Sequence, residues 1–280
     1  MIIGNDRHSV IKNIEQNLKD GAYNKKVETD DPVISADQGK KIVQEYLSRG
    51  VFKRFFTVLI RRFANIGSRI INKNTDIVGM EKLQGITNGI ITCNHFNHLD
   101  NTAVRKLTCK LKKKRLNIIC QLTNFAMKGP IGLLMKYADT IPLSEERHYM
   151  SETLPVILDD LIKKDEFVLI YPEKEMWFNY RVPRPVLRGA YLFSARLNAP
   201  IISCFIEMQD LPKEDSQGFN KVRYTLHILG VIKPDPEKNV RQNSIDMAKA
   251  DYELKCAAYE KIYNKKVSYE FSKADIAGLN

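Results

Sequence analysis

Short apolar runs that alternate with helical patterns constrain the fold of this chain more than any other feature of its sequence. The runs typical of buried strands are Gly89–Cys93, Leu116–Gln121, Phe167–Tyr171 and Pro200–Glu207, and Val222–Ile232 alternates as a half-exposed strand does. Helical patterns lie between or after them, at about 100–114, 129–137, 145–164, 189–197 and 244–263. Strands that alternate with helices predict an α/β fold, in which a mixed, mostly parallel sheet is flanked by helices.

The chain divides into three parts by composition. Residues 1–34 are polar and mixed in charge, and we expect a weakly structured or partly helical lead-in there. Residues 35–75 form an amphipathic, basic helical segment, which opens with the capping-box pattern of Ser35–Gln38 and breaks near Gly50. Residues 76–280 hold the strands. With 280 residues, 44% of them hydrophobic, the chain suits one large domain with a helical appendage.

The helical segment combines an apolar side with a strongly basic one. Residues 43–73 carry seven basic side chains and one acidic side chain, Glu45, and the apolar positions include Phe52, Phe55, Phe56 and Phe63. Such a helix can lie in the headgroup region of an anionic membrane, and we expect it to do so. The alternative is that its apolar side packs on the main domain.

The net charge of the chain indicates the kind of partner, and its cysteines indicate the cellular compartment. The 44 basic and 33 acidic residues give a net charge of +11, which favours an anionic partner. The five cysteines are scattered without a CxxC pair, as in a protein with reduced, buried thiols. No apolar run reaches the roughly 18–20 residues of a spanning helix, and the N-terminus lacks a signal-peptide core. We therefore expect a cytoplasmic protein that contacts the membrane peripherally.

The segment Cys93–Asn101 holds the residues best suited to catalysis. A strand ends there in a polar turn with His95, and Asp100 follows where a helix begins. Histidine can act as a base near neutral pH, and a carboxylate on its other ring nitrogen fixes the tautomer. The two side chains can meet at a strand-to-helix turn, although they could not on a regular helix. A metal site of His95, His98 and Asp100 competes with this interpretation, but no further cluster supplies a strong ligand, so we expect no metal.

Two further segments follow or precede buried strands. Tyr171-Pro172-Glu173 comes directly after an apolar strand, where α/β sheets bind ligands, and Pro200 opens another strand. Together with the histidine segment, they resemble the glycerolipid acyltransferase superfamily, which includes the lysophosphatidic-acid and glycerol-3-phosphate acyltransferases. The resemblance covers residues 79–232. It is carried by four blocks: Asn94–Asp100, like the family's Asn-His-x4-Asp; Tyr171–Glu173, like its Phe-Pro-Glu; Ala199–Ile202; and Ala138–Leu143.

The resemblance implies an O-acyltransferase of the 1-acylglycerol-3-phosphate type. In this mechanism His95, held by Asp100, deprotonates an acceptor hydroxyl, which attacks the thioester of an acyl-coenzyme A or acyl-carrier protein. The implied acceptor is a lysophospholipid or a glycerol phosphate at the membrane, and the reaction needs no cofactor and no metal. Residues 76–280 would be the acyltransferase domain, with phospholipid biosynthesis as its role.

Departures from the family pattern place the acceptor in doubt. Lys174-Glu175-Met176 replaces the family's Gly-Thr-Arg, and Ser144 stands where the second phosphate-binding arginine is expected. An alternative acceptor without phosphate, such as a glycolipid, an amino-acid lipid or a polyol, therefore remains, as does a non-catalytic lipid-binding protein. The candidate substrate-binding residues are Tyr171, Pro172, Glu173, Lys174, Trp177, Arg181, Arg184 and Arg188.

A second basic cluster spans Arg105–Arg115, with seven basic residues and no acidic one. It is either a solvated helix face or a contact for lipid headgroups, coenzyme A phosphates or an acidic carrier protein. Nucleic acid is not expected, because no nucleic-acid-binding motif accompanies the charge.

Overall fold

The computed structural model describes residues 4–29, 32–113 and 115–279, and of Val51, Lys53 and Arg54 it describes the backbone alone. The side chains of Lys53, Arg54 and Lys114, which belong to the two basic segments, therefore lie outside the described part of the chain.

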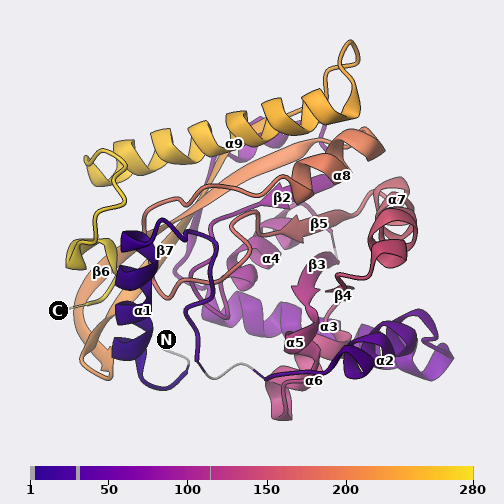
Figure 1. Cartoon of the computed structure of the whole chain (residues 1–280), viewed down its shortest axis with the longest axis horizontal. Coiled ribbons are helices and arrows are strands. Elements are labelled where there is room, and N and C mark those ends of the chain that lie inside the picture. Colours follow the sequence, from indigo (N-terminus) through magenta and orange to yellow (C-terminus); the bar gives the residue numbers. More distant parts are fainter. Residues whose placement is uncertain (1–3, 30–31, 114, 280) are drawn as a thin grey trace.

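The described residues form a seven-stranded sheet in the order β1-β7-β6-β2-β5-β3-β4 (Figure 1). Its strands are β1 (Asp76–Val78), β2 (Gly89–Thr92), β3 (Leu116–Gln121), β4 (Thr140–Leu143), β5 (Phe167–Ile170), β6 (Ile201–Ser216) and β7 (Phe219–Ile232). Neighbouring strands are parallel, except that β6 and β7 form a long antiparallel hairpin. The predicted mixed, mostly parallel sheet flanked by helices is confirmed.

Helices lie in the predicted regions, α1 lies in the polar lead-in, and the short helix α5 was not predicted. They are α1 (Arg7–Lys19), α2 (Ala36–Leu47), α3 (Val51–Ile71), α4 (Asn101–Lys110), α5 (Leu122–Phe125), α6 (Gly129–Tyr137), α7 (Leu154–Lys163), α8 (Gly189–Leu197) and α9 (Val240–Tyr263). The capping box is formed, because the hydroxyl of Ser35 accepts from the backbone of Gln38 while the amide oxygen of Gln38 accepts from the backbone of Ser35. Gly50 separates α2 from α3. None of the described helices is long and apolar enough to cross a membrane.

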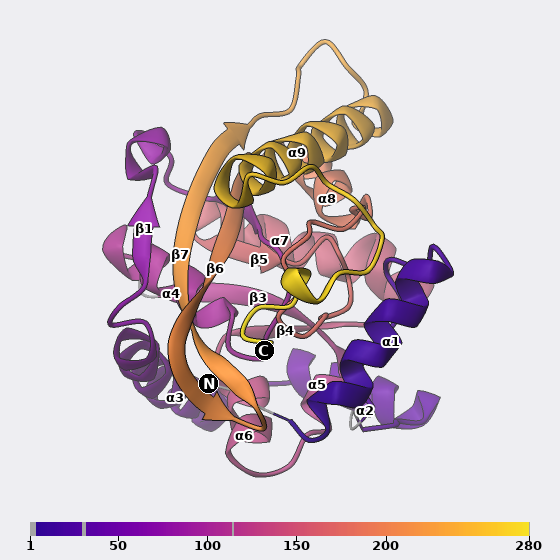
Figure 2. The same cartoon turned by 90° about the vertical axis from the view of Figure 1, so that its left-hand side faces the viewer.

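Alternate residues of the central strands pack into two separate cores, one on each face of the sheet. Ile91 packs in the core that contains Val104 and Leu107 of α4, whereas Ile90 packs in the core that contains residues of α7, α8 and α9. Figure 2 shows the sheet between these two layers. Burial on both faces explains why the strand sequences are continuous apolar runs rather than alternating ones.

The N-terminal part is built into the domain more closely than its polar composition indicates. Val10, Ile14 and Leu18 lie on one side of α1 and are buried in a third core, together with Trp177 and Phe178. Their helical spacing forms a narrow apolar stripe. Charged residues stand between these apolar positions in the sequence, so the average composition of the segment is polar and does not indicate the stripe.

Helix α3 turns its apolar side away from the domain. Phe52, Phe55 and Phe63 are 85%, 66% and 61% exposed. The side that packs on the domain carries small or polar residues, with Ser68 and Asn72 buried. The alternative in which the apolar side forms core packing therefore does not agree with the structure.

Part of the second basic cluster is structural. Arg105 is buried and donates to the carbonyl of Ala138. Lys106 donates to the carbonyls of Asn72 and Thr75 at 2.6 and 2.7 Å. Lys106 therefore fixes α4 to the end of α3, and Arg105 fixes it to the end of α6.

Candidate active site

The site forms where β2 and β5 end side by side. The two strands are parallel and in register, with Thr92 opposite Ile170. The loops that follow them therefore leave from the same edge of the sheet, which is where open α/β sheets bind ligands. This register brings His95, three residues beyond β2, against Tyr171, directly beyond β5.

His95 and Asp100 are paired. Nδ1 of His95 lies 2.8 Å from Oδ2 of Asp100, and the histidine side chain is 21% exposed whereas that of the aspartate is 1% exposed. The carboxylate accepts a hydrogen bond from the N–H group at Nδ1, so the lone pair of Nε2 remains for a substrate. This arrangement is suited to a general base with a fixed tautomer.

Asp100 is held by more than the histidine. Its Oδ2 accepts from the backbone of Phe96 at 3.0 Å and of Asn97 at 3.2 Å, and its Oδ1 accepts from the hydroxyl of Tyr171. A buried carboxylate with several donors stays in one orientation. The turn between β2 and α4 therefore closes around the carboxylate and aims it at the imidazole.

Tyr171 contacts both members of the pair. Its ring stacks on that of His95, with 3.9 Å between centroids and 13° between planes. Burial raises the pKa of the Tyr171 hydroxyl well above its usual value, and the negative charge of Asp100 raises it further. The hydroxyl therefore remains protonated and donates to Asp100 at physiological pH.

Glu173 supports the loop of His95 from behind the site. It is buried and forms an ion pair of 2.9 Å with Arg184, which is buried as well. Its carboxylate also accepts from the backbone of His95 at 3.3 Å, and Arg184 stacks over the ring of Trp177. Burial lowers the pKa of Arg184, while the neighbouring Glu173 raises it.

The strand end that carries His95 is also fixed from the opposite face of the sheet. The hydroxyl of Thr92 donates to Asp251 of α9 at 2.9 Å, and Lys255 donates to Thr92 at 3.0 Å. Asp251 and Lys255 are themselves a fully buried ion pair. This network anchors β2 just before the polar turn.

A cavity of about 370 Å³ opens next to His95. Most of its lining is apolar and comes from α6, β3, β5, α8 and the segments between them: Ile118, Ile119, Met127, Ile131, Met135, Leu143, Met150, Ile170, Leu187, Ala190 and Phe193. A smaller polar set completes it: Glu28, His98, Asn101, Gln121, Asn124, Lys174 and Glu175. An apolar cavity with a few polar groups is suited to a ligand that has a hydrocarbon chain and a polar end.

Three of the candidate substrate-binding residues line this cavity, namely Tyr171, Pro172 and Lys174. Arg188 does not, but it is exposed and stands between Leu187 and Gly189, which do.

Glu173, Trp177, Arg181 and Arg184 are buried and do not line the cavity. Arg181 donates to the carbonyl of Ala274 and forms an ion pair of 2.6 Å with Asp210. The sequence indicated these residues as substrate ligands, but in the structure they lie outside the cavity. Their polar groups are used within the protein, and a substrate could reach them only if those bonds broke.

Several polar residues of the cavity were not among the sequence candidates. Gln121 donates to Glu175 at 2.8 Å across the cavity wall, and Asn124 stands one turn further along. Gln121 is the last residue of a parallel strand, and that position alone marks it as a candidate. Glu28 could not be found this way, because it reaches the cavity from the N-terminal part and is paired with Arg7.

Residues 74–207 match the family model described as Acyltransferase. This match confirms the predicted resemblance to the acyltransferases, and it includes the segment with His95 and Asp100.

One solved structure illustrates the fold likeness: the 1-acyl-sn-glycerophosphate (LPA) acyltransferase PlsC from Thermotoga maritima. The two are 13% identical, the match covers 94% of this chain and 100% of that chain, and the TM-score is 0.52. The comparison with curated proteins found no match to this sequence.

Proposed function

We propose that this protein is an O-acyltransferase that moves a fatty-acyl group from an acyl thioester to the hydroxyl of a membrane lipid or its precursor. The observation that carries the proposal is the contact between His95 and Asp100 at the edge of an apolar cavity. This arrangement supplies a base and a place for a hydrocarbon chain in one site.

The proposed reaction needs no covalent enzyme intermediate. Nε2 of His95 takes the proton of the acceptor hydroxyl, and the acceptor oxygen attacks the thioester carbonyl carbon. The tetrahedral oxyanion then collapses: the new C–O bond remains, the C–S bond breaks, and the leaving thiolate takes the proton from the imidazolium. Asp100 stabilises the imidazolium while it exists.

The apolar part of the cavity is suited to the acyl chain. Ile131 and Met135 of α6 and Phe193 of α8 present hydrocarbon and aromatic surface to it. Burial of methylene groups contributes roughly 0.8 kcal/mol each. The donor would be acyl-coenzyme A or acyl-carrier protein.

The polar part of the cavity favours a second candidate, an acceptor without phosphate. Its charged side chains are Lys174, Glu28 and Glu175, and it contains no arginine among the lining residues that the structure describes. Phosphate groups are usually bound by arginine forks or several cations, and a nearby carboxylate repels them. Arg147, the cation nearest in sequence to Ser144, is exposed and does not line the cavity. A glycolipid, an amino-acid lipid or a polyol is therefore a stronger candidate than a glycerol phosphate.

We also propose that the protein acts at an anionic membrane surface, on the cytoplasmic side. The exposed apolar side of α3 supports this, because large apolar patches on a folded surface indicate an interaction with lipid or protein. Arg62 and Arg69 of the same helix are exposed and can contact anionic headgroups.

The test is a thiol-release assay with a panel of acceptors. Purified protein, acyl-coenzyme A and mixed vesicles are supplied with lysophosphatidic acid, glycerol 3-phosphate, monoacylglycerol or a mono-acylated amino-acid lipid. Acyl transfer to at least one acceptor supports the proposed function, and a preference for the last two supports the second candidate. Faster turnover with lysophosphatidic acid than with every neutral acceptor would exclude the second candidate, and no turnover by any donor and acceptor would contradict the function itself.

A further inference from the structure

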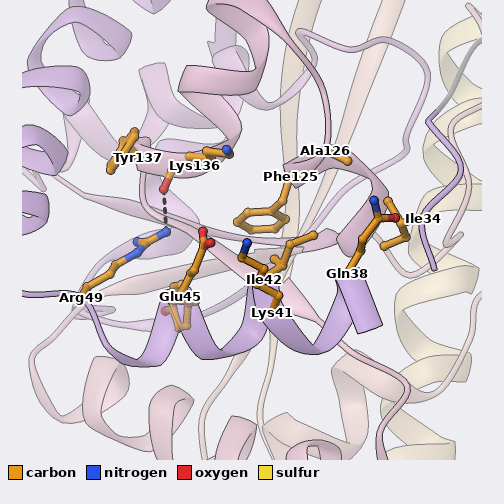
Figure 3. A pocket seen from close by; sticks show the side chains of 11 residues that line it. Ile34, Gln38, Lys41, Ile42, Glu45, Arg49, Phe125, Ala126, Lys136 and Tyr137 are labelled. Carbon is orange, nitrogen blue, oxygen red and sulfur yellow. Dashed lines mark hydrogen bonds between the residues drawn. The ribbon is translucent and has the colours of Figure 1, made fainter. Parts of the chain in front are cut away.

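A second cavity, of about 270 Å³, lies between α2, α5 and α6, separate from the cavity that His95 lines. Figure 3 shows one wall formed by α2, with Lys41 and Glu45 along it and Arg49 just beyond its end, and Phe125 and Lys136 on the facing side. Its volume is slightly below the range of about 300–1,000 Å³ that small-molecule sites have, which suits a headgroup better than a whole coenzyme.

The lining of this cavity is cationic. Lys41, Arg49 and Lys136 contribute three positive charges and Glu45 one negative charge. Within the part of the chain that the structure describes, neither Lys41 nor Lys136 forms an ion pair. An anion that enters the cavity would therefore meet cations that the protein itself leaves uncompensated.

The guanidinium of Arg49 is positioned to bind an anion in this cavity. Its guanidinium lies 4.5 Å from the ring centroid of Tyr46 and donates one hydrogen bond to the carbonyl of Lys136, which leaves further N–H groups for a ligand. Burial lowers the pKa of Arg49. A guanidinium that has lost solvent gains from a nearby anion more than an exposed one does.

The cavity also adjoins the exposed apolar side of α3. Arg49 belongs to the short connection between α2 and α3, and Tyr137, which lines the cavity, contacts Phe56 of α3 with 6.3 Å between ring centroids. A molecule with a charged head and a hydrocarbon tail could place the head in the cavity and the tail along α3.

The two cavities share their walls. Asn124 and Met127 line the catalytic cavity, whereas Phe125 and Ala126, between them, line the second one. Helix α6 is used in the same way, because Met135 faces the first cavity while Lys136 lines the second. A headgroup bound in the second cavity would therefore hold the catalytic cavity at the membrane surface.

We propose that this second cavity binds the phosphate headgroup of an anionic membrane lipid. The lipid is a structural ligand rather than a substrate, since the cavity is not lined by His95 or Asp100. Lys41, Arg49 and Lys136 contact the phosphate, and the acyl chains lie along the apolar side of α3.

The experiment uses a monomeric lipid, so that general attraction to a charged surface does not contribute. The full chain is titrated with dihexanoylphosphatidylglycerol below its critical micelle concentration, and in separate arms with coenzyme A, inorganic phosphate and dihexanoylphosphatidylcholine. Wild-type protein should bind the anionic lipid saturably and more tightly than the other three. The double variant Lys41→Gln, Lys136→Gln should bind the anionic lipid at least about tenfold more weakly than the wild type does, because two charged hydrogen-bond donors are removed.

A matched control removes the same charge from the same region. Lys40 and Lys128 are exposed, lie on α2 and directly before α6, and do not line the cavity. The variant Lys40→Gln, Lys128→Gln should bind like the wild type. The proposal is overturned if the two double variants bind alike, if no saturable binding is found, or if the pocket variant loses coenzyme A or inorganic phosphate binding and keeps that of the lipid. None of these outcomes depends on the proposed reaction.

Discussion

Tyr171 lies flat against the ring of His95 and donates its hydroxyl to Asp100, the carboxylate that holds the same histidine. The tyrosine follows β5 and the histidine follows β2, so two neighbouring strands fix the three side chains as a unit. The family motif contains the histidine and the aspartate, but in this protein the aromatic residue before Pro172 contacts both of them.

Replacement of Tyr171 by phenylalanine tests this relationship. The variant keeps a ring for stacking but leaves Oδ1 of Asp100 without its tyrosine donor. Loss of one partner of a buried carboxylate costs about 1–3 kcal/mol, so kcat should fall roughly 5- to 150-fold while KM for the acyl donor changes little. Steady-state kinetics provide the measurement. Unchanged kcat would show that the hydroxyl has no role in positioning Asp100.

Arg184 distinguishes a structural cation from a substrate ligand. Because it pairs with buried Glu173, Arg184→Met should leave an uncompensated buried carboxylate and destabilise the fold by about 3–5 kcal/mol. Thermal unfolding should show a lower Tm, and Glu173→Gln in the same chain should restore part of it. A normal Tm with a raised KM for the acceptor would instead support the substrate-binding role that the sequence alone indicated.

The reactivity of Cys120 can distinguish base catalysis by His95 from a mechanism in which a cysteine thiolate attacks the substrate. It lines the catalytic cavity, and burial raises the pKa of its thiol to about 12 from an ordinary value of 9.0. At pH 8 its thiolate fraction should be roughly 1,000-fold below that of an ordinary thiol, because the thiol form persists until the pH approaches the raised pKa.

The measurement for Cys120 is its rate of alkylation by iodoacetamide, followed by mass spectrometry as the pH rises from 7 to 10. Alkylation should be slow at pH 8 and accelerate with pH, and Cys120→Ser should retain acyl transfer. Rapid alkylation at pH 8, together with an inactive serine variant, would indicate a cysteine nucleophile.

The exposed apolar side of α3 leads to a prediction about membrane binding. Phe55→Glu with Phe63→Glu should weaken binding to phosphatidylglycerol vesicles, since both side chains are exposed and would carry charge into the lipid. The fold should be preserved, because exposed positions away from packed contacts usually change stability by at most about 0.5 kcal/mol. Vesicle sedimentation and thermal unfolding are the two measurements.

The control for α3 places the same charge on exposed polar residues of the neighbouring segments of the chain, one on α2 and one just after α3, as Gln44→Glu with Asn74→Glu. This control should bind vesicles better than the phenylalanine variant does. Equal binding of the two variants would mean that charge alone, and not the apolar side, attaches the protein to the membrane.

The central strands could be predicted because burial on both faces makes them continuous apolar runs, as in Phe167–Ile170. The edge strands could not. β1 has three residues, and β4 contains Pro142, which an edge strand tolerates because it needs fewer backbone donors. Such segments lack a clear apolar signal, so only their pairing with β7 and β3 identifies them.

In the candidate site, too, a contact within one short segment could be predicted from the sequence, whereas contacts between separate segments could not. The contact between His95 and Asp100 depends on one short turn, and the resemblance of Asn94–Asp100 to the family motif predicted it. The roles of Arg181 and Arg184 depend on partners 29 and 11 residues away, namely Asp210 and Glu173. A basic residue in a proline-rich loop has the same local sequence whether its partner is a buried carboxylate or a substrate, so composition could not distinguish them.

The central claim is that His95 is the catalytic base and Asp100 its partner. The most direct measurement is the single-turnover rate of acyl transfer for His95→Ala, Asp100→Ala and, as the matched control, His98→Ala, each in protein shown to be folded. His98 lines the same cavity but is not the histidine paired with Asp100. Loss of a positioned base should reduce the rate roughly 10²–10⁴-fold in the first two variants, with a far smaller change in the control. A His95→Ala protein that keeps its rate while His98→Ala loses it would contradict the account.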